Sequence, residues 1–184
     1  MSAGGNTSAA DVLAFWRAAG PDKWFKKDAG LDGEIVSRFA ALWHIAAAGA
    51  LSEWEAAAES ALALVIVLDQ FPRNMFRGKA DAFATDALAR AVTERAIARG
   101  FDQKVPGSER VFFYLPFEHS ESLADQERAV ALVSKLGDPD LTRWSELHAD
   151  VIRRFGRFPH RNSALGRATT REEQEYLDAG GFAG

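Results

Sequence analysis

An all-α fold of about eight helices is predicted from three features of this sequence of 184 residues. Apolar residues recur at helical spacing in most segments, capping patterns precede several of these segments, and no series of strand-like segments alternates with them. A chain of this length buries about 70% of the surface that its unfolded form exposes. Because no Pro-, Ser- or charge-rich linker divides it, we expect one compact domain over residues 1–184.

The first hundred residues predict four helices, of which three have simple boundaries. The pattern Ser-x-x-Asp at residues 8–11 is typical of a capping box, and the apolar face that follows stops at Gly20 and Pro21. After a turn-rich stretch, apolar residues at 35–46 have helical spacing. A further helix is expected over residues 81–99.

The remaining helix of this half contains the most apolar segment of the chain. The pattern Ser-x-x-Glu at residues 52–55 is expected to open it, and it continues to about Gln70 before Pro72 breaks it. Its apolar run at 61–68 is compatible with a buried strand, but the Ala- and Glu-rich approach and the total length favour a helix that is apolar on all sides. We expect this helix at the centre of the molecule.

The second half of the chain predicts four more helices. Residues 108–117 suit a strand as well as a helix, and we assign them to a helix. Capping residues at Ser122, Asp138 and Thr170 predict helices that reach about residues 136, 155 and 180.

Composition excludes several classes of function. The chain has no Cys, which removes thiol catalysis, thiolate metal sites and disulfides. Its 22 Lys and Arg against 26 Asp and Glu give a net charge of −4, so its bulk charge does not favour nucleic acid or an anionic membrane. Residues 1–8 do not resemble a signal peptide, so we expect a cytoplasmic protein, and no apolar run is long enough to span a bilayer.

No motif predicts a metal ion or another cofactor. The sequence lacks a Gly-rich phosphate loop, a G-x-S-x-G elbow and an H-E-x-x-H pair. Its four His, at positions 44, 119, 148 and 160, have no ligand-like spacing. We interpret His44 and His148, on amphipathic helices, as residues at the edge of the core.

Asp69 is the first candidate site residue, because it ends the most apolar helix of the chain. Desolvation and the negative end of the helix dipole both disfavour a carboxylate there, so a cationic partner is expected. Arg73 and Arg77 follow directly, beside Asn74. These residues serve equally well as a structural lock between a helix end and a loop or as part of a ligand site.

Glu118 and His119 form a second candidate pair directly after aromatic and apolar residues. Apolar surroundings raise the pKa of a carboxyl group, and His titrates near neutrality, so either residue can exchange a proton at working pH. A hydrogen-bonded helix junction is the alternative interpretation.

A run of arginines forms the third candidate. Six arginines and no Asp, Glu or Lys lie between Arg153 and Arg171. Because the whole chain carries −4 and this stretch +6, the rest of the chain carries −10. Arginine is the side chain suited to bidentate recognition of carboxylate or phosphate. Its anion-binding candidates are Arg157, His160, Arg161 and Asn162, together with Arg73, Asn74 and Arg77; the alternative is that these arginines neutralise the chain's own acidic residues.

Long motifs in the sequence resemble the bacterial DUF924 family. They lie at residues 68–78, 114–127 and 154–167 and contain all three candidates. The resemblance implies stacked antiparallel helix pairs, similar to tetratricopeptide-like proteins, and no established activity. The sequence departs from the family pattern at Arg17, because a third aromatic residue is expected there after Phe15 and Trp16.

Two hypotheses follow for the function. In the first, an arginine-lined site binds a small molecule that carries phosphate or carboxylate, and Glu118, His119 or Asp69 moves a proton. In the second, stacked helices form an interaction module that recognises an acidic protein or peptide. RNA binding rests on the arginine run alone and ranks last.

Overall fold

The computed structural model describes residues 7–183, and these fold into α-helices, short 3₁₀ turns and one π turn, with no strand among them. The all-α prediction is therefore confirmed. The chain forms two compact units: unit 1 contains residues up to 77 together with 81–106, and unit 2 contains 78–80 together with 107 onwards. No helix within residues 7–183 is long and apolar enough to cross a membrane.

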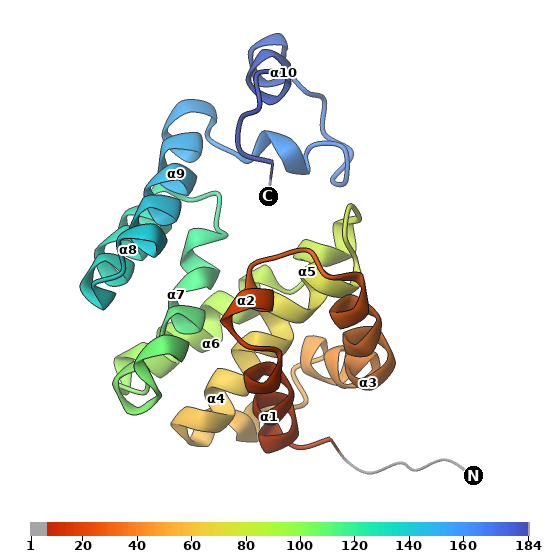
Figure 1. The fold of residues 1–184 in the computed structure, drawn as a ribbon, viewed down its shortest axis with the longest axis vertical. Coiled ribbons are helices and arrows are strands. Elements are labelled where there is room, and N and C mark those ends of the chain that lie inside the picture. The colour runs from red at the N-terminus through yellow and green to blue at the C-terminus, as the bar shows by residue number, and fades with distance from the viewer. Residues whose placement is uncertain (1–6, 184) are drawn as a thin grey trace. The chain divides into compact units, whose positions relative to one another are not determined.

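Unit 1 contains the first six helices (Figure 1). They are α1 (Ala9–Ala19), α2 (Pro21–Trp24), α3 (Ala29–Ala47), α4 (Ala58–Val65), α5 (Phe71–Met75) and α6 (Asp86–Ala98). The capping box at Ser8 is confirmed, since Ser8 and Asp11 cap each other at the start of α1. Helix α3 begins earlier than expected, because the Asp28 side chain accepts from the Leu31 amide and the turn-rich stretch is helical.

The most apolar segment is helical and forms the centre of unit 1. Helix α4, a π turn over Ile66–Gln70 and α5 follow one another without a gap, and they pack against α1, α3 and α6. Phe71 lies fully buried in an aromatic cluster, with its ring centroid 4.8 Å from that of Phe39 and 5.9 Å from that of Trp16. Two expectations were wrong here: the helix continues through Pro72, and it begins at Ala58 instead of Ser52.

Backbone conformation and a tertiary contact explain why the central helix does not begin at Ser52 as expected. Residues Ser52–Ala56 form a 3₁₀ turn, and Ala57 is extended, which separates them from α4. Glu55 does not cap a helix, because both its carboxylate oxygens accept from Arg95, at 2.6 and 2.8 Å. The helix expected over 81–99 likewise begins later, at Asp86, because residues Ala80–Phe83 form a 3₁₀ turn.

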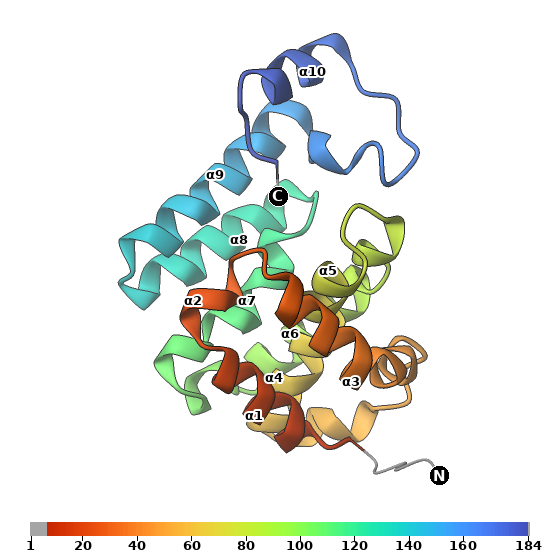
Figure 2. The ribbon, with the colours of Figure 1, turned by 45° about the vertical axis from the view of Figure 1, so that its right-hand side comes forward.

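Unit 2 contains the last four helices (Figure 2). They are α7 (Val111–Glu118), α8 (Leu123–Val133), α9 (Pro139–Phe155) and α10 (Arg171–Asp178). The caps predicted at Ser122, Asp138 and Thr170 are all confirmed. The ambiguous segment is the helix α7, which packs on α8, and α8 lies side by side with α9 in Figures 1 and 2.

Candidate functional site

Asp69 lies in the π turn of unit 1 and is fully buried. Arg73 Nη1 donates to the Asp69 backbone oxygen at 2.8 Å and to its Oδ1 at 3.2 Å, and Gln70 Nε2 donates to Oδ2 at 2.7 Å. The prediction that Asp69 is buried and ion-paired is therefore confirmed, with Arg73 as its partner.

Arg73 has a second carboxylate partner that the sequence did not reveal. Its Nη1 and Nη2 donate to the two carboxylate oxygens of Asp86 at 2.9 and 3.1 Å. Burial disfavours the charged guanidinium, but the negative charges of Asp69 and Asp86 outweigh burial and raise the pKa of Arg73. Two internal carboxylates thus hold this arginine.

Arg77 and Asn74 also have an internal acceptor. Arg77 donates through Nε and Nη2 to Asp32 on α3, at 2.6 and 2.9 Å, and Asn74 Nδ2 donates to the same carboxylate at 2.8 Å. Burial alone would raise the pKa of Asp32. The hydrogen bonds from Arg77 and Asn74 outweigh the effect of burial, so the pKa of Asp32 is below its ordinary value. In unit 1 the structure therefore gives both side chains a structural role.

In unit 2, Arg157 and Asn162 meet on Glu173 at the start of α10. Arg157 donates through Nε and Nη2 at 2.6 and 2.8 Å, and Asn162 Nδ2 donates at 3.1 Å. The hydrogen bonds from Arg157 and from the Thr170 amide lower the pKa of Glu173 to about 2, although burial opposes them. Arg167 is held in the same way by both oxygens of Glu121, at 2.7 and 3.0 Å.

Glu118 and His119 stand at the C-terminal end of α7. Gln126 of α8 fixes this end, because its Nε2 donates to the backbone oxygens of Glu118 and Ser120, both at 2.6 Å. Glu118 is buried, and its Oε1 lies 3.3 Å from Nδ1 of His148 on α9. The carboxylate predicted as a proton carrier is therefore next to an imidazole.

His148 is neutral at working pH. Burial, reinforced by the charges of His119, Arg161 and His160, lowers the pKa of His148 to about 3, although its contact with the Trp144 carbonyl opposes this shift. Nδ1 lies 2.7 Å from that carbonyl oxygen, which can only accept, so Nδ1 carries the proton. Nε2 of the neutral ring then has a lone pair that can take up a proton.

The 3₁₀ turn Pro159–Arg161 places the remaining candidates beside this pair. Arg161 is buried, its Nη1 donates to the His119 backbone oxygen at 3.0 Å, and its guanidinium lies 4.3 Å from the ring centroid of Phe158. The rings of His119 and His148 are 6.3 Å apart. We call this set the histidine cluster: Glu118, His119, His148, His160 and Arg161.

The candidate residues thus fall into two groups. Asp69 and the first arginine loop lie in unit 1, and the histidine cluster lies in unit 2. Sequence reasoning placed His148 in the core, where it lies, but missed its pairing with Glu118. His148 lies on the buried face of α9 together with Ala149 and Ile152, and nothing local identified a carboxylate partner from another helix. Among residues 7–183, no group of His, Asp and Glu has the arrangement of a metal site.

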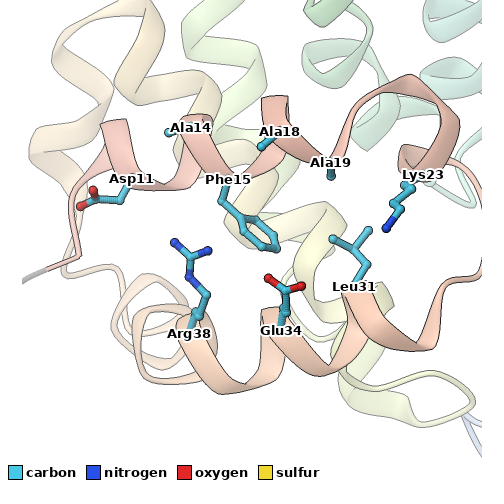
Figure 3. A pocket seen from close by; sticks show the side chains of 9 residues that line it. All are labelled: Asp11, Ala14, Phe15, Ala18, Ala19, Lys23, Leu31, Glu34 and Arg38. Carbon is cyan, nitrogen blue, oxygen red and sulfur yellow. The ribbon is translucent and has the colours of Figure 1, made fainter.

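Unit 1 also has a surface groove of about 450 Å³ between α1 and α3. Figure 3 shows Arg38 and Glu34 reaching from α3 toward Phe15 on α1. The Arg38 guanidinium lies 4.7 Å from the centroid of the Phe15 ring. The groove combines an apolar floor with charged side chains of both signs, and Asp11 and Lys23 complete its rim.

Comparison with known proteins identifies the family. The model of a family described as "Bacterial protein of unknown function (DUF924)" matches residues 12–181. The chain belongs to the DUF924 family. The resemblance found in the sequence motifs is therefore confirmed, and the match to DUF924 includes helices of both units.

A solved structure is similar to the chain over nearly its whole length. The chain is 52% identical to a protein of unknown function from Agrobacterium tumefaciens, ATU0120, with a TM-score of 0.90. The similarity covers 93% of this chain and 97% of that one. A search of curated proteins found no match. Since the DUF924 family and the Agrobacterium protein are both described as of unknown function, the function of this DUF924 protein is argued from its own residues.

Proposed function

We propose that the histidine cluster of unit 2 binds a small anion bearing a carboxylate or phosphate, and that Glu118 and His148 exchange a proton with it. The observation that carries this proposal is the 3.3 Å contact between the Glu118 carboxylate and the His148 imidazole, with Arg161 beside them. A carboxylate and a neutral imidazole in a buried setting are the groups that general acid–base chemistry uses.

Arg161 is the group in the cluster that favours an anionic ligand. Arg161 keeps its proton at any working pH, and its charge is one of the causes that lower the pKa of His148. A bound anion would oppose that effect, because a negative charge beside His148 favours the imidazolium form and raises its pKa. Ligand binding and protonation of His148 are therefore expected to reinforce each other.

The proposal leaves out Asp69, Arg73, Asn74, Arg77, Arg157 and Asn162. Each of these side chains has an internal partner in the structure, and the arginines and asparagines among them donate to carboxylates of the chain. An external anion would have to displace those carboxylates, which are tethered and therefore held at high effective concentration. These residues are better explained as the scaffold around the ends of α5 and α9.

Imidazole NMR tests the proposal directly. Titration with inorganic phosphate, and separately with acetate, should shift the signals of His119, His148 and His160 along saturating curves. His44 is the internal reference, because it lies exposed on α3 in unit 1; the expectation that it borders the core was wrong. If no cluster signal saturates, or if all four His shift together as they would with ionic strength, the cluster is not an anion site.

A second function, recognition of a peptide, is favoured by the groove between α1 and α3. Its apolar floor suits a Leu or Phe side chain, and Arg38 is positioned to meet an acidic residue of the same peptide. Fluorescence polarisation with short peptides in which Asp or Glu flanks Leu or Phe tests this function. Arg38→Ser should abolish binding, whereas Arg95→Ser, which removes an exposed arginine paired with Glu55, should leave it unchanged.

A further inference from the structure

The segment after α10 folds back over the histidine cluster within unit 2. We call residues 180–183 the C-terminal latch. Its Phe182 ring lies 4.3 Å from the ring of His148, 5.2 Å from that of His160 and 6.2 Å from that of Phe158, measured between centroids. Phe182 thus fills an aromatic slot that these three rings form.

The latch has a specific seat on Tyr176 of α10. The Tyr176 hydroxyl accepts from the Phe182 amide at 2.8 Å, and the Tyr176 carbonyl accepts from the Gly181 amide at 3.0 Å. A Cβ on Gly181 would lie only 2.5 Å from two carbons of the Tyr176 ring and 2.6 Å from the Tyr176 backbone oxygen. Only glycine permits this close approach, so the closed position of the latch is built into the chain.

The phenyl ring uses only the apolar and aromatic character of the slot that it fills. His148 and His160 have polar ring nitrogens, whereas Phe182 has no atom that can donate or accept a hydrogen bond. Phe158 is fully buried, but Phe182 is only half-buried. Besides the two hydrogen bonds to Tyr176, the latch is held by packing of Phe182 against the cluster of Val151, Ile152 and Phe158, so a ligand ring that displaces it has to replace this apolar contact.

We propose that the slot filled by Phe182 is a ligand subsite for a planar ring, and that the ligand of the histidine cluster is an aromatic or heteroaromatic anion that displaces the latch. This inference rests on the proposed function and narrows its substrate class. The ring of the ligand takes the place of the phenyl group between His148, His160 and Phe158, and its carboxylate or phosphate meets the charge of Arg161.

Competition between latch and ligand follows from this arrangement. A ligand that binds only when the latch is open has an apparent affinity reduced by the fraction of open molecules. Any substitution that unseats the latch without touching the slot should therefore tighten binding. Gly181→Ala is such a substitution, because it acts on the contact with Tyr176 and the backbone φ there is not in the left-handed region.

Calorimetric titration of the full chain with four probes tests the inference. Phenyl phosphate and benzoate carry a ring and an anion, inorganic phosphate carries the anion alone, and benzyl alcohol carries the ring alone. Phenyl phosphate should bind at least about ten-fold more tightly than inorganic phosphate, because it adds a buried ring. Benzyl alcohol should bind weakly or not at all. This result would show that the ligand does not simply fill an apolar cavity.

Variants then test the latch. Gly181→Ala should tighten phenyl phosphate by about three-fold or more, since it raises the open fraction. Gly107→Ala is the matched control, because its added Cβ meets no atom within 4 Å, and it should leave affinity unchanged. Phe182→Ala should act in the same direction as Gly181→Ala, which keeps the test decisive if one variant fails to fold.

The outcomes separate the two proposals. If inorganic phosphate binds as tightly as phenyl phosphate and shifts the cluster signals, the proposed anion site stands and the ring subsite is wrong. If phenyl phosphate binds more tightly but neither latch variant changes its affinity, the latch does not compete and the inference is overturned. If no anion binds to any variant, both proposals are wrong.

Discussion

The hydroxyl of Thr85 donates to the backbone oxygen of Leu68 at 2.5 Å, where a proline has removed the usual donor. In an α-helix the amide of residue 72 would donate to the carbonyl of residue 68, but Pro72 has no N–H, and the π turn before it instead pairs the Phe71 amide with the Ile66 carbonyl. Thr85 also accepts from Trp43 Nε1 at 3.2 Å. A side chain from the start of α6 thus satisfies the backbone group, and the central helix of unit 1 continues through Pro72.

Thr85→Val should lower the free energy of unfolding by about 2–4 kcal/mol, because it leaves both a buried carbonyl and a buried indole N–H without this partner. Thr93→Val is the matched control. Thr93 is also fully buried in unit 1, but its hydroxyl has no hydrogen-bond partner within residues 7–183. Urea unfolding should therefore find Thr93→Val neutral or stabilising, and equal losses in the two variants would contradict this account of Pro72.

Arg73→Met should destabilise the protein by about 3–5 kcal/mol, because it removes a buried cation from between two carboxylates. Arg77→Met is the comparison, since the pair of Arg77 with Asp32 is partly exposed and should contribute about 1 kcal/mol or less. Chemical denaturation of both variants at pH 7 measures the difference. A loss for Arg73→Met no larger than that for Arg77→Met would show that the buried pair is not a structural lock.

Local signals predicted much of the fold, and tertiary contacts account for the errors. Ser8, Ser122, Asp138 and Thr170 cap helices because the cap and the groups that it satisfies lie within four residues. Pro72 was misread because its compensating donor, Thr85, comes from another helix. Rules for local sequence describe the hydrogen-bond donor that a proline removes from a helix. They do not describe a donor from elsewhere in the chain that replaces it.

His148 should make stability fall as the solution is acidified. The folded protein holds its pKa at about 3, whereas an unfolded His titrates near 6.5, so the contribution of neutral His148 is complete above pH 6.5 and declines as the pH falls toward 3. The charged and titratable groups around it are Glu118, His119, His160 and Arg161.

His148→Asn should flatten this dependence, because Asn does not titrate and can still donate to the Trp144 carbonyl. Between pH 6 and 4.5 the slope of unfolding free energy against pH should differ from that of the parent by up to about 1.4 kcal/mol per unit. Urea unfolding over this range measures it. Identical slopes for the parent and His148→Asn would refute the neutral state of His148.

Glu173→Gln should lower stability by about 2 kcal/mol at pH 7, because Glu173 accepts charge-assisted hydrogen bonds from Arg157 and also caps α10. Since its pKa is lowered to about 2, this contribution is complete above about pH 4.5 and is lost as the pH falls toward 2. Parent and variant should therefore converge in acid. Glu172→Gln removes an exposed pair with Arg154 and should cost about 1 kcal/mol or less in thermal unfolding.

The candidate site was predicted less completely than the fold. The pairing of Asp69 with Arg73 was accessible, because the partners are four residues apart on one helix. The pairing of Glu118 with His148 was not, since it joins α7 to α9. Arginines were identified correctly as needing acceptors, but their acceptors Glu121 and Glu173 lie outside the arginine run and could not be assigned from spacing.

The paired arginines have a practical consequence for handling the protein. The run of six arginines between residues 153 and 171 suggests a strong cationic patch, yet Arg153, Arg154, Arg157, Arg167 and Arg171 form ion pairs with carboxylates of the chain. Arg161 is buried. A sulfonate or heparin resin therefore meets a surface whose positive charge is already compensated, and the protein should elute from it at low ionic strength.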